Sequence, residues 1–329
     1  MIRSQPGGIG FDLTDAIRDI VAAKLGPRPA VVAVESRPSP SRSSAALDEV
    51  EVTRADGSVI RLVCKDAGHD AYPGSASVKP RFVVDPVREI ETYRVALDPY
   101  GVGPTWFGAI VEPRSARYVL VLELVQGSLL FQIGGLESWL HAAGWAARFH
   151  DQLAPAARAI APSAHLLRYE ERYYRTWSDR ARAFARGSAR HDQIDAVVDA
   201  HDAAIPRLLS LPATVIHGEF FAANILIRDD ASQSVCPIDW EMAAIAPGLI
   251  DLAALAAGGW SESERSAIID AYRGASNTYG RCADPAFADA LDACRLHLAV
   301  RWLGWSPSWV PPAHHAHDWL AEAQRVVKN

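Results

Sequence analysis

Several features that would place the chain in other classes of protein are missing from it. None of the four cysteines forms a CxxC pair, which argues against a zinc site or a disulfide framework and favours a reducing cytoplasm. The first ten residues lack the charged start and apolar run of a signal peptide, and charge interrupts every long apolar stretch before it reaches membrane-spanning length. The sequence therefore predicts a soluble, cytoplasmic protein without a membrane partner.

Positive charge is also in short supply. The 33 lysines and arginines are outnumbered by 39 acidic residues, the net charge is -6, and no basic stripe is visible, so we expect no nucleic-acid partner. The sequence has no GxxxxGKS or GxxxxGKT loop, no GxGxxG after a predicted strand, and no GxSxG elbow. These absences disfavour P-loop nucleotidases, dinucleotide enzymes and serine hydrolases.

The hydrophobic residues that are present, 49% of 329, are enough for a substantial core. Apolar periodicity predicts strands and two helices in the first part of the chain, with a hairpin around the turn at 55–57. After Gly127 the pattern is mainly helical. The expected helices and strands of the first part are 11–25, 31–34, 50–53, 58–63, 85–97 and 118–125, and the expected later strands are 214–216, 225–227 and 235–238. This is a two-lobe α+β layout with a β-rich lobe at 1–125 and a helical lobe at 126–329.

The strongest chemical signal is HGEFFAANILI, which spans 217–227, followed by VCPIDWE at 235–241. Glu219 and Asn224 are expected on one loop between a strand and a hairpin, and Asp239 closes that hairpin. A carboxylate beside an attacking hydroxyl, together with two oxygen ligands of the kind that magnesium prefers, is what phosphoryl transfer requires.

This segment resembles the catalytic and metal-binding loops of the aminoglycoside phosphotransferase and choline kinase family, which read His-Gly-Asp, four residues, Asn, then Ile-Asp-Trp or Ile-Asp-Phe. The resemblance implies a protein-kinase-like fold, with ATP and Mg²⁺ as cofactors. It implies that Asn224 and Asp239 bind magnesium and that Glu219 occupies the position of the catalytic aspartate. It further implies that His217 supports the loop and that Asp251 braces it.

The resemblance extends into the first lobe. Lys65 matches the strand lysine that holds nucleotide phosphates, and Glu89 matches the helix glutamate that pairs with it. Glu91 is a rival, but two residues along a helix turn a side chain to another face, so only one of the two can face Lys65, and the family spacing favours Glu89. The segment ELVQG resembles the hinge between the lobes, which implies that the Glu123 carbonyl and the Val125 amide bind adenine.

Two departures from the family pattern leave two functions open. Glutamate at position 219 is longer than aspartate by one methylene, which shifts the carboxylate by about 1 Å, enough to cost ~100-fold in rate. The polar segment 36–45 has no glycine for close approach to phosphates, although Ser41, Ser43 and Ser44 could donate to them. We expect an O-phosphotransferase that acts on a hydroxyl of a small antibiotic or metabolite; the alternative is a kinase-fold protein that binds a nucleotide or ligand without efficient transfer.

The acceptor side of the chain is less informative. Segments 169–184 and 291–305 carry aromatic and charged residues where this family builds its acceptor pocket. Trp302 and Trp305, three apart, are typical of packing between helices, and an aromatic wall for a hydrophobic or cationic acceptor is the minority interpretation. The sequence predicts neither the acceptor nor the oligomeric state.

The remaining histidines have ordinary explanations. In HHAHD, at 314–318, His314 and His317 could share a helix face, but prolines precede them and an apolar pair follows, which favours a helix start over a zinc site. His201 and His297 are expected to be surface or core histidines without a catalytic role.

Overall fold

The first part of the chain forms an antiparallel sheet with a helix on each face. The computed structural model describes residues 9, 12–40, 45–68, 79–163, 165–307 and 317–328. The sheet has the order β1-β2-β3-β5-β4, and all its neighbouring strands are antiparallel. Its strands are β1 (Val31–Pro38), β2 (Leu47–Arg54), β3 (Val59–Asp66), β4 (Trp106–Glu112) and β5 (Arg117–Glu123). The hairpin predicted around 55–57 is the β2–β3 connection.

Alternation along β3 decides which side chains face which helix. Leu62 and Cys64 are fully buried in a cluster that includes Ile17 of α1 (Thr14–Leu25). Because successive side chains of a strand point to opposite faces, Lys65 projects from the other face of the sheet. On that side, Leu120 of β5 packs against the helical segment that starts with α2.

The helix expected at 85–97 is shorter and less regular than predicted. The α-helical part is α2 (Arg88–Thr92), followed by a wider π-helical turn over Tyr93–Leu97. Asp85 does not begin the helix; its carboxylate accepts the N–H of Val87, a local turn that delays the helix to Arg88.

The second part of the chain contains two small sheets and most of the helices. One sheet has the order β10-β9-β6 and the other β7-β11-β8. The strands are β6 (Gly127–Leu129), β7 (Leu167–Arg168), β8 (Ala213–Ile216), β9 (Ile225–Arg228), β10 (Val235–Pro237) and β11 (Ala244–Pro247). The helices are α3 (Leu136–Leu153), α4 (Ala157–Ile160), α5 (Glu171–Ala185), α6 (His191–Ser210), α7 (Leu249–Leu255), α8 (Glu262–Ala275), α9 (Asp284–Leu303) and α10 (Trp319–Lys328).

The predicted strands of this part correspond to β8, β9 and β10, whereas β6, β7 and β11 were not predicted. All six strands have four residues or fewer, but β8, β9 and β10 carry β-branched residues, whereas β6 and β7 have none and β11 has only Ile245. β4 was missed for another reason. Its sequence, WFGAIVE, is apolar up to the last residue, so polar and apolar residues do not alternate along the strand.

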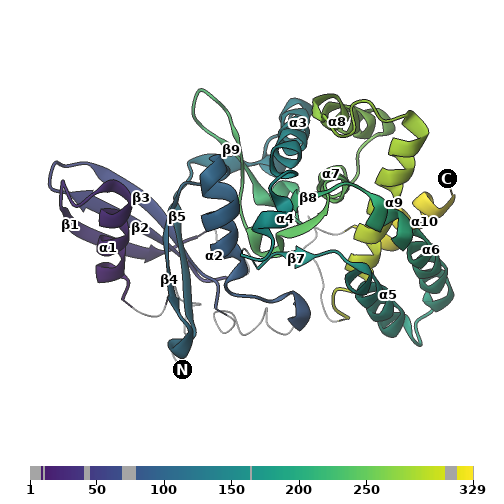
Figure 1. The fold of residues 1–329 in the computed structure, drawn as a ribbon, viewed down its shortest axis with the longest axis horizontal. Coiled ribbons are helices and arrows are strands. Elements are labelled where there is room, and N and C mark those ends of the chain that lie inside the picture. Colours follow the sequence, from purple (N-terminus) through teal and green to yellow (C-terminus); the bar gives the residue numbers. More distant parts are fainter. Residues whose placement is uncertain are drawn as a thin grey trace.

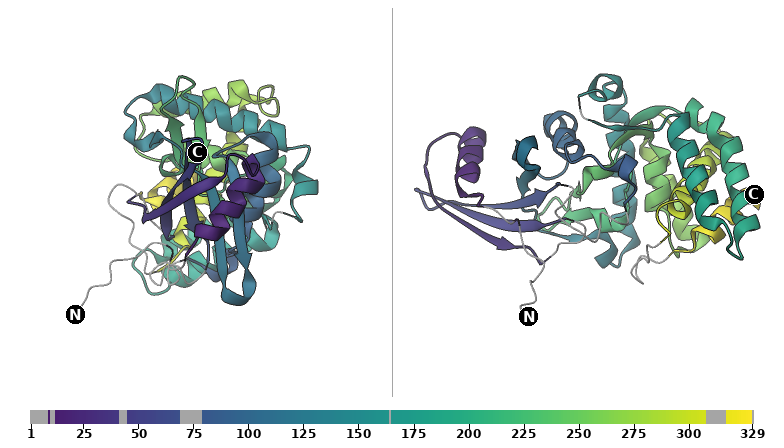
Figure 2. Two further views of the ribbon diagram at one scale, coloured as in Figure 1. Left: turned by 90° about the vertical axis from the view of Figure 1, so that its left-hand side faces the viewer. Right: turned by 90° about the horizontal axis from the view of Figure 1, so that it is seen from below.

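The large helical core is built around α9, which packs against α5, α6, α7 and α10. The five-stranded sheet lies at one end of the elongated molecule, and α5, α6, α9 and α10 lie at the other (Figure 1 and Figure 2). Despite the length and burial of α9, no helix of the described residues is long and apolar enough to cross a membrane. The fold is the predicted α+β kinase-like arrangement, with the candidate site between the sheet and the helices.

Candidate active site

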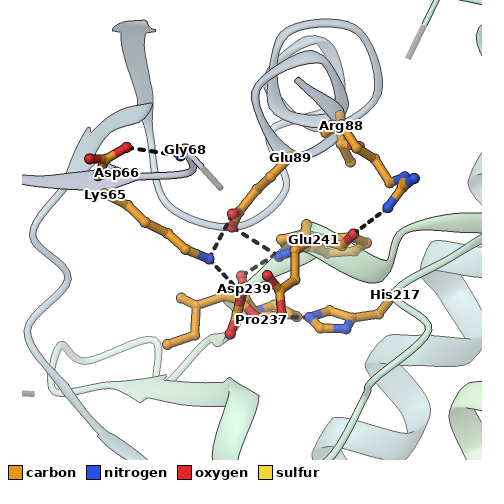
Figure 3. Close-up of polar contacts among 12 residues, drawn as sticks. Lys65, Asp66, Gly68, Arg88, Glu89, His217, Pro237, Asp239 and Glu241 are labelled. Carbon is orange, nitrogen blue, oxygen red and sulfur yellow. Dashed lines mark hydrogen bonds and ion pairs between the residues drawn. The ribbon is translucent and has the colours of Figure 1, made fainter. Parts of the chain in front are cut away.

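A lysine and two carboxylates meet where the sheet faces the second part of the chain (Figure 3). Lys65 Nζ, from β3, lies 2.7 Å from Glu89 Oε2 of α2 and 2.5 Å from Asp239 Oδ1, which follows β10. The other carboxylate oxygen of Glu89 accepts the backbone N–H of Trp240 at 3.1 Å. The contacts therefore connect β3, α2 and the loop after β10 at one point.

The three charges stabilise one another in a buried place. Burial alone would lower the pKa of Lys65, but the Asp239 and Glu89 carboxylates outweigh burial and hold that pKa above its usual value. Burial likewise works to raise the pKa of Asp239, and the adjacent Lys65 reverses the shift, so Asp239 stays ionised. Burial raises the pKa of Glu89, and Lys65 opposes that shift.

Of the two glutamates in α2, only Glu89 contacts Lys65. The Glu89 side chain is 3% exposed, whereas Glu91 points away and pairs with Arg94. Arg88 of the same helix donates to the backbone carbonyl of Glu241 at 3.0 Å, so α2 has a second anchor in the loop after β10.

A buried carboxylate holds the backbone of the loop after β8 in place. Asp251, at the start of α7, accepts the backbone N–H groups of His217 at 2.7 Å and of Gly218 at 2.9 Å. His150 Nε2 lies 3.1 Å from the same carboxylate, and the hydroxyl of Tyr272 lies 2.9 Å from His150 Nδ1. This network fixes the backbone immediately before Glu219.

Gly218 adopts a conformation that other residues rarely adopt. Its φ is +81°, and a Cβ built there would lie 2.3 Å from the carbonyl oxygen of Met242. His217 crosses in the other direction: its Nε2 lies 2.8 Å from the carbonyl oxygen of Ile238, the residue before Asp239. Both contacts keep the loop after β8 against the loop after β10.

Asn224 and Asp239, the predicted magnesium ligands, lie on directly connected segments. The N–H of Ile238 donates to the Asn224 carbonyl at 2.9 Å, and the Asn224 side-chain nitrogen donates to the Glu219 carbonyl at 3.0 Å. This hydrogen bond uses only the side-chain nitrogen of Asn224 and leaves its amide oxygen for a metal. An ionised carboxylate and an amide oxygen are hard ligands, which suits Mg²⁺ with phosphate oxygens and water completing the shell.

Glu219 is mostly buried, with its side chain 14% exposed, and is paired with an arginine from a distant helix. Its Oε1 accepts a hydrogen bond at 3.3 Å from Arg301, in the last turn of α9. Burial raises the pKa of Glu219 to about 7, Arg301 opposes this shift, and Glu241 adds to it. Glu241 itself is paired with Lys79 at 2.5 Å. The candidate base is thus paired with Arg301 and feels the charges of the Lys79–Glu241 pair.

The predicted hinge residues lie where the chain leaves β5 for β6. The Glu123 side chain accepts hydrogen bonds from Arg228 at 2.6 Å and from the N–H of Thr105 at 3.0 Å. The bond from Arg228 holds the pKa of Glu123 down to about 2. Val125 is half-buried in the connection to β6. The Glu123 side chain therefore connects β5 to β9, a contact that the sequence did not indicate.

The polar segment 36–45 is not a loop throughout. β1 extends to Pro38, because pairing with β2 continues through Ser36, whose hydroxyl also donates to Asp48 at 3.3 Å. Ser41, Ser43 and Ser44, the candidate phosphate donors, lie outside the described residues.

The other histidines behave as core or surface residues. His201 and His297 are fully buried, and their ring nitrogens lie 3.2 Å apart. His317 comes shortly before α10, and His314 lies outside the described residues. In the part of the chain that the structure describes, no group of three or more histidine, cysteine or carboxylate side chains could hold a metal.

The two tryptophans of the acceptor segment differ in their surroundings. Trp305, two residues after the end of α9, stacks on Trp177 of α5 at 5.7 Å between ring centroids, so it packs the segment after α9 against α5. Trp302 is half-buried and lies beside Trp319 and beside Phe221, two residues after Glu219. Sequence reasoning did not single out Arg301 or Lys79, because only the fold brings them to the site.

The fold and this site define a class: a protein-kinase-like fold in which a strand lysine, a helix glutamate and a loop aspartate meet. Residues 108–290, more than half of the chain, match the sequence profile of the phosphotransferase enzyme family, so the chain belongs to that family. The match includes Glu219, Asn224 and Asp239 but not Lys65, and no curated protein matches the whole sequence significantly.

Solved structures of that class have the same fold at low sequence identity. Choline kinase LicA from Streptococcus pneumoniae is 14% identical with a TM-score of 0.53, over 95% of this chain and 97% of that one. Macrolide 2'-phosphotransferase MphH from Brachybacterium faecium is 16% identical with a TM-score of 0.54, over 88% and 90%. Spectinomycin phosphotransferase APH(9)-Ia, in complex with ADP and spectinomycin, is 12% identical with a TM-score of 0.58, over 98% and 100%.

Proposed function

We propose that the protein is an ATP- and Mg²⁺-dependent O-phosphotransferase that transfers the γ-phosphoryl group to a hydroxyl of a small molecule. The observation that carries the proposal is the meeting of Lys65, Glu89 and Asp239 in one largely buried cluster, beside a loop that presents Glu219 and Asn224. Phosphoryl transfer depends on positioning and charge stabilisation more than on covalent chemistry, and this cluster supplies both.

Each residue has a defined part in this proposal. Lys65, held by Glu89, donates to the phosphates of the nucleotide, while the Glu123 carbonyl and Val125 amide hold its adenine. Asn224 and Asp239 hold Mg²⁺, which when bound neutralises phosphate charge. Glu219 accepts the proton of the acceptor hydroxyl as its oxygen bonds to the γ-phosphorus and the bond to the β-phosphate oxygen breaks.

The proposal keeps the predicted division of the chain. It assigns nucleotide binding to a lobe at 1–125, and the catalytic loop and the acceptor to a lobe at 126–329. Similar structures include a choline kinase and a spectinomycin phosphotransferase with spectinomycin bound, which supports a small hydroxylated acceptor here. Because these structures are at most 14% identical to this chain, the acceptor itself is to be identified by experiment.

A second candidate function rests on a specific observation. Glu219 is already paired with Arg301, and glutamate is longer than the aspartate that family members carry at this position. A chain that binds nucleotide or another ligand in this cleft without efficient transfer would show these features too. In that case no acceptor would be phosphorylated, whether the cleft binds MgATP or another ligand.

Substitution of one metal ligand tests the main proposal. Asp239→Asn keeps the shape of the side chain and removes its charge, so we expect MgATP-dependent transfer to fall by at least 100-fold. Asp98→Asn, which breaks a surface pair with Lys24, is the matched control. Transfer is measured as nucleoside diphosphate formed with a panel of hydroxylated acceptors and with water. Unchanged turnover in Asp239→Asn would contradict the proposed function.

Nucleotide binding is tested separately by melting temperature. A ligand that binds only the folded protein raises its Tm, so ATP with Mg²⁺ should raise the Tm more than ATP alone. ADP and GTP, each with and without Mg²⁺, complete the titration. A Mg²⁺-dependent shift without transfer to any acceptor would favour the second candidate. No shift with any nucleotide would contradict the main proposal and leave only a protein that binds another ligand in this cleft.

A further inference from the structure

Arg301 is a buried cation that contacts the catalytic loop at two points. Its side chain is 0% exposed although it lies in the last turn of α9. One terminal nitrogen donates to the carbonyl of Gly218 at 2.6 Å, and the other donates to Glu219 Oε1 at 3.3 Å. The guanidinium therefore spans the backbone before the candidate base and the carboxylate of the base itself.

The surroundings of Arg301 keep it in that position. The hydroxyl of Tyr169 lies 3.4 Å from the nitrogen that contacts Gly218, and the guanidinium lies 5.7 Å from the ring of Trp302 and 6.0 Å from that of Trp305. Burial of a guanidinium is costly unless a carboxylate compensates it, and Glu219 is its ion-pair partner. The pair thus forms one buried unit with the loop.

We infer that Arg301 is a positioning residue for Glu219 in phosphoryl transfer, an inference that rests on the proposed function. Glutamate has one more rotatable bond than aspartate, so its carboxylate needs an additional restraint to stay at the reacting hydroxyl. Arg301 holds Oε1 and leaves Oε2 to accept the hydroxyl proton. Because the same guanidinium holds the Gly218 carbonyl, the loop and the side chain are fixed together.

The geometry requires a planar fork. Two terminal nitrogens of one guanidinium reach two different oxygens, whereas a lysine ammonium is a single point of charge. An aspartate at 219 would withdraw its carboxylate by about one bond length, so its contact with Arg301 would lengthen beyond a hydrogen bond. Arg301 and the glutamate are therefore a matched pair, and the longer side chain works because the arginine is present.

A double-mutant cycle tests this inference. The variants are Arg301→Gln, Arg301→Lys, Glu219→Asp and the double variant Arg301→Gln/Glu219→Asp. Two activities are measured: hydrolysis of MgATP, as phosphate released, and phosphoryl transfer to a panel of acceptors. We expect Arg301→Gln to lower kcat roughly 100-fold with the KM for MgATP unchanged, and Arg301→Lys to recover part of that loss. Arg295→Gln, in the same helix and paired with Asp292 and Glu322, is the control.

The double variant gives the decisive comparison. If Arg301 acts through the glutamate, Arg301→Gln should cost less than about 3-fold in the Glu219→Asp background. An equal loss in both backgrounds, or a wild-type kcat in Arg301→Gln, would overturn this inference alone. Absence of transfer from the wild-type protein, to water and to every acceptor, would overturn the proposed function and this inference with it.

Discussion

Glu89 accepts the backbone N–H of Trp240 at 3.1 Å, across 151 positions of sequence. The same carboxylate lies 2.7 Å from Lys65, so one side chain of α2 fixes both the strand lysine and the loop that carries Asp239. Displacement of α2 would therefore release the lysine and the loop together. The activity of the site should depend on the charge of Glu89 as well as on its shape.

Glu89→Gln tests that dependence. Glutamine keeps the length of the side chain and one acceptor oxygen but loses the charge that balances Lys65, so we expect kcat/KM for MgATP to fall on the order of 10–100-fold. Glu91→Gln is the matched control, because Glu91 is two positions away and pairs with Arg94 at the surface. Equal effects of the two substitutions in a steady-state assay would contradict the role given to Glu89.

Gly218→Ala should destabilise the protein at the loop after β8. The substitution meets a φ of +81° and a carbonyl oxygen at 2.3 Å, and the two together should lower the free energy of unfolding by about 3 kcal/mol. Gly57→Ala separates the causes, since Gly57 has a φ of +82° with nothing within 4 Å of its Cβ position. That control should cost roughly 1 kcal/mol. Urea unfolding measures both, and equal losses would show that the contact with Met242 is unimportant.

Local sequence patterns predicted the parts of the fold that repeat or that carry chemistry. The alternation in β2 and β3 marked a hairpin with Lys65 on it, and the spacing of Glu219, Asn224 and Asp239 marked one loop and one hairpin. The short strands β6, β7 and β11 were missed because they have almost no β-branched residues, so their own sequence carries no strand pattern. The α+β layout was predictable from these local patterns, whereas the protein-kinase-like fold was implied by the family resemblance.

The residues missed at the site share one property. Arg301 is in α9, a helix that is buried on most sides. In the sequence it looks like a charged residue that interrupts a run of apolar core positions. Only the packing of α9 against the loop after β8 gives it a function. Lys79 is similar, because its partner Glu241 lies more than 100 positions away. Such pairs cannot be found from periodicity or from short motifs.

His201 should make stability depend on pH. Burial lowers its pKa to about 4 from an ordinary value of 6.5, with Asp202 opposing the shift and Arg182 and Arg175 adding to it. The imidazole also lies 3.2 Å from His297. The unfolded chain takes up a proton at higher pH than the folded one, so this contribution is complete above pH 6.5 and is lost as the pH falls from there toward 4.

The measurement is urea unfolding at several pH values between 7.5 and 4.5. We expect the wild-type free energy of unfolding to fall by on the order of 2 kcal/mol more than that of His201→Gln over this range. His191→Gln, on the exposed side of the same helix, should retain the wild-type slope. Parallel curves for wild type and His201→Gln would show that the buried imidazole is not the group responsible.

Asp251→Asn tests whether the loop before Glu219 needs a carboxylate beneath it. The two oxygens of Asp251 accept the N–H groups of His217 and Gly218, at 2.7 and 2.9 Å. Asparagine has one oxygen, so in either orientation its NH₂ group faces a backbone N–H, and one buried donor loses its acceptor. Such a loss costs about 1–3 kcal/mol.

The loss should appear in both stability and activity, because the two N–H groups belong to the residues that precede the candidate base. Tyr272→Phe is the graded control: it removes only the hydroxyl beside His150, one contact further from the loop, and should cost about 1 kcal/mol with little change in kcat. Denaturant unfolding and phosphate release from MgATP are compared for the two variants. If Asp251→Asn lost stability but kept the wild-type kcat, the carboxylate would support the fold without setting the geometry of Glu219.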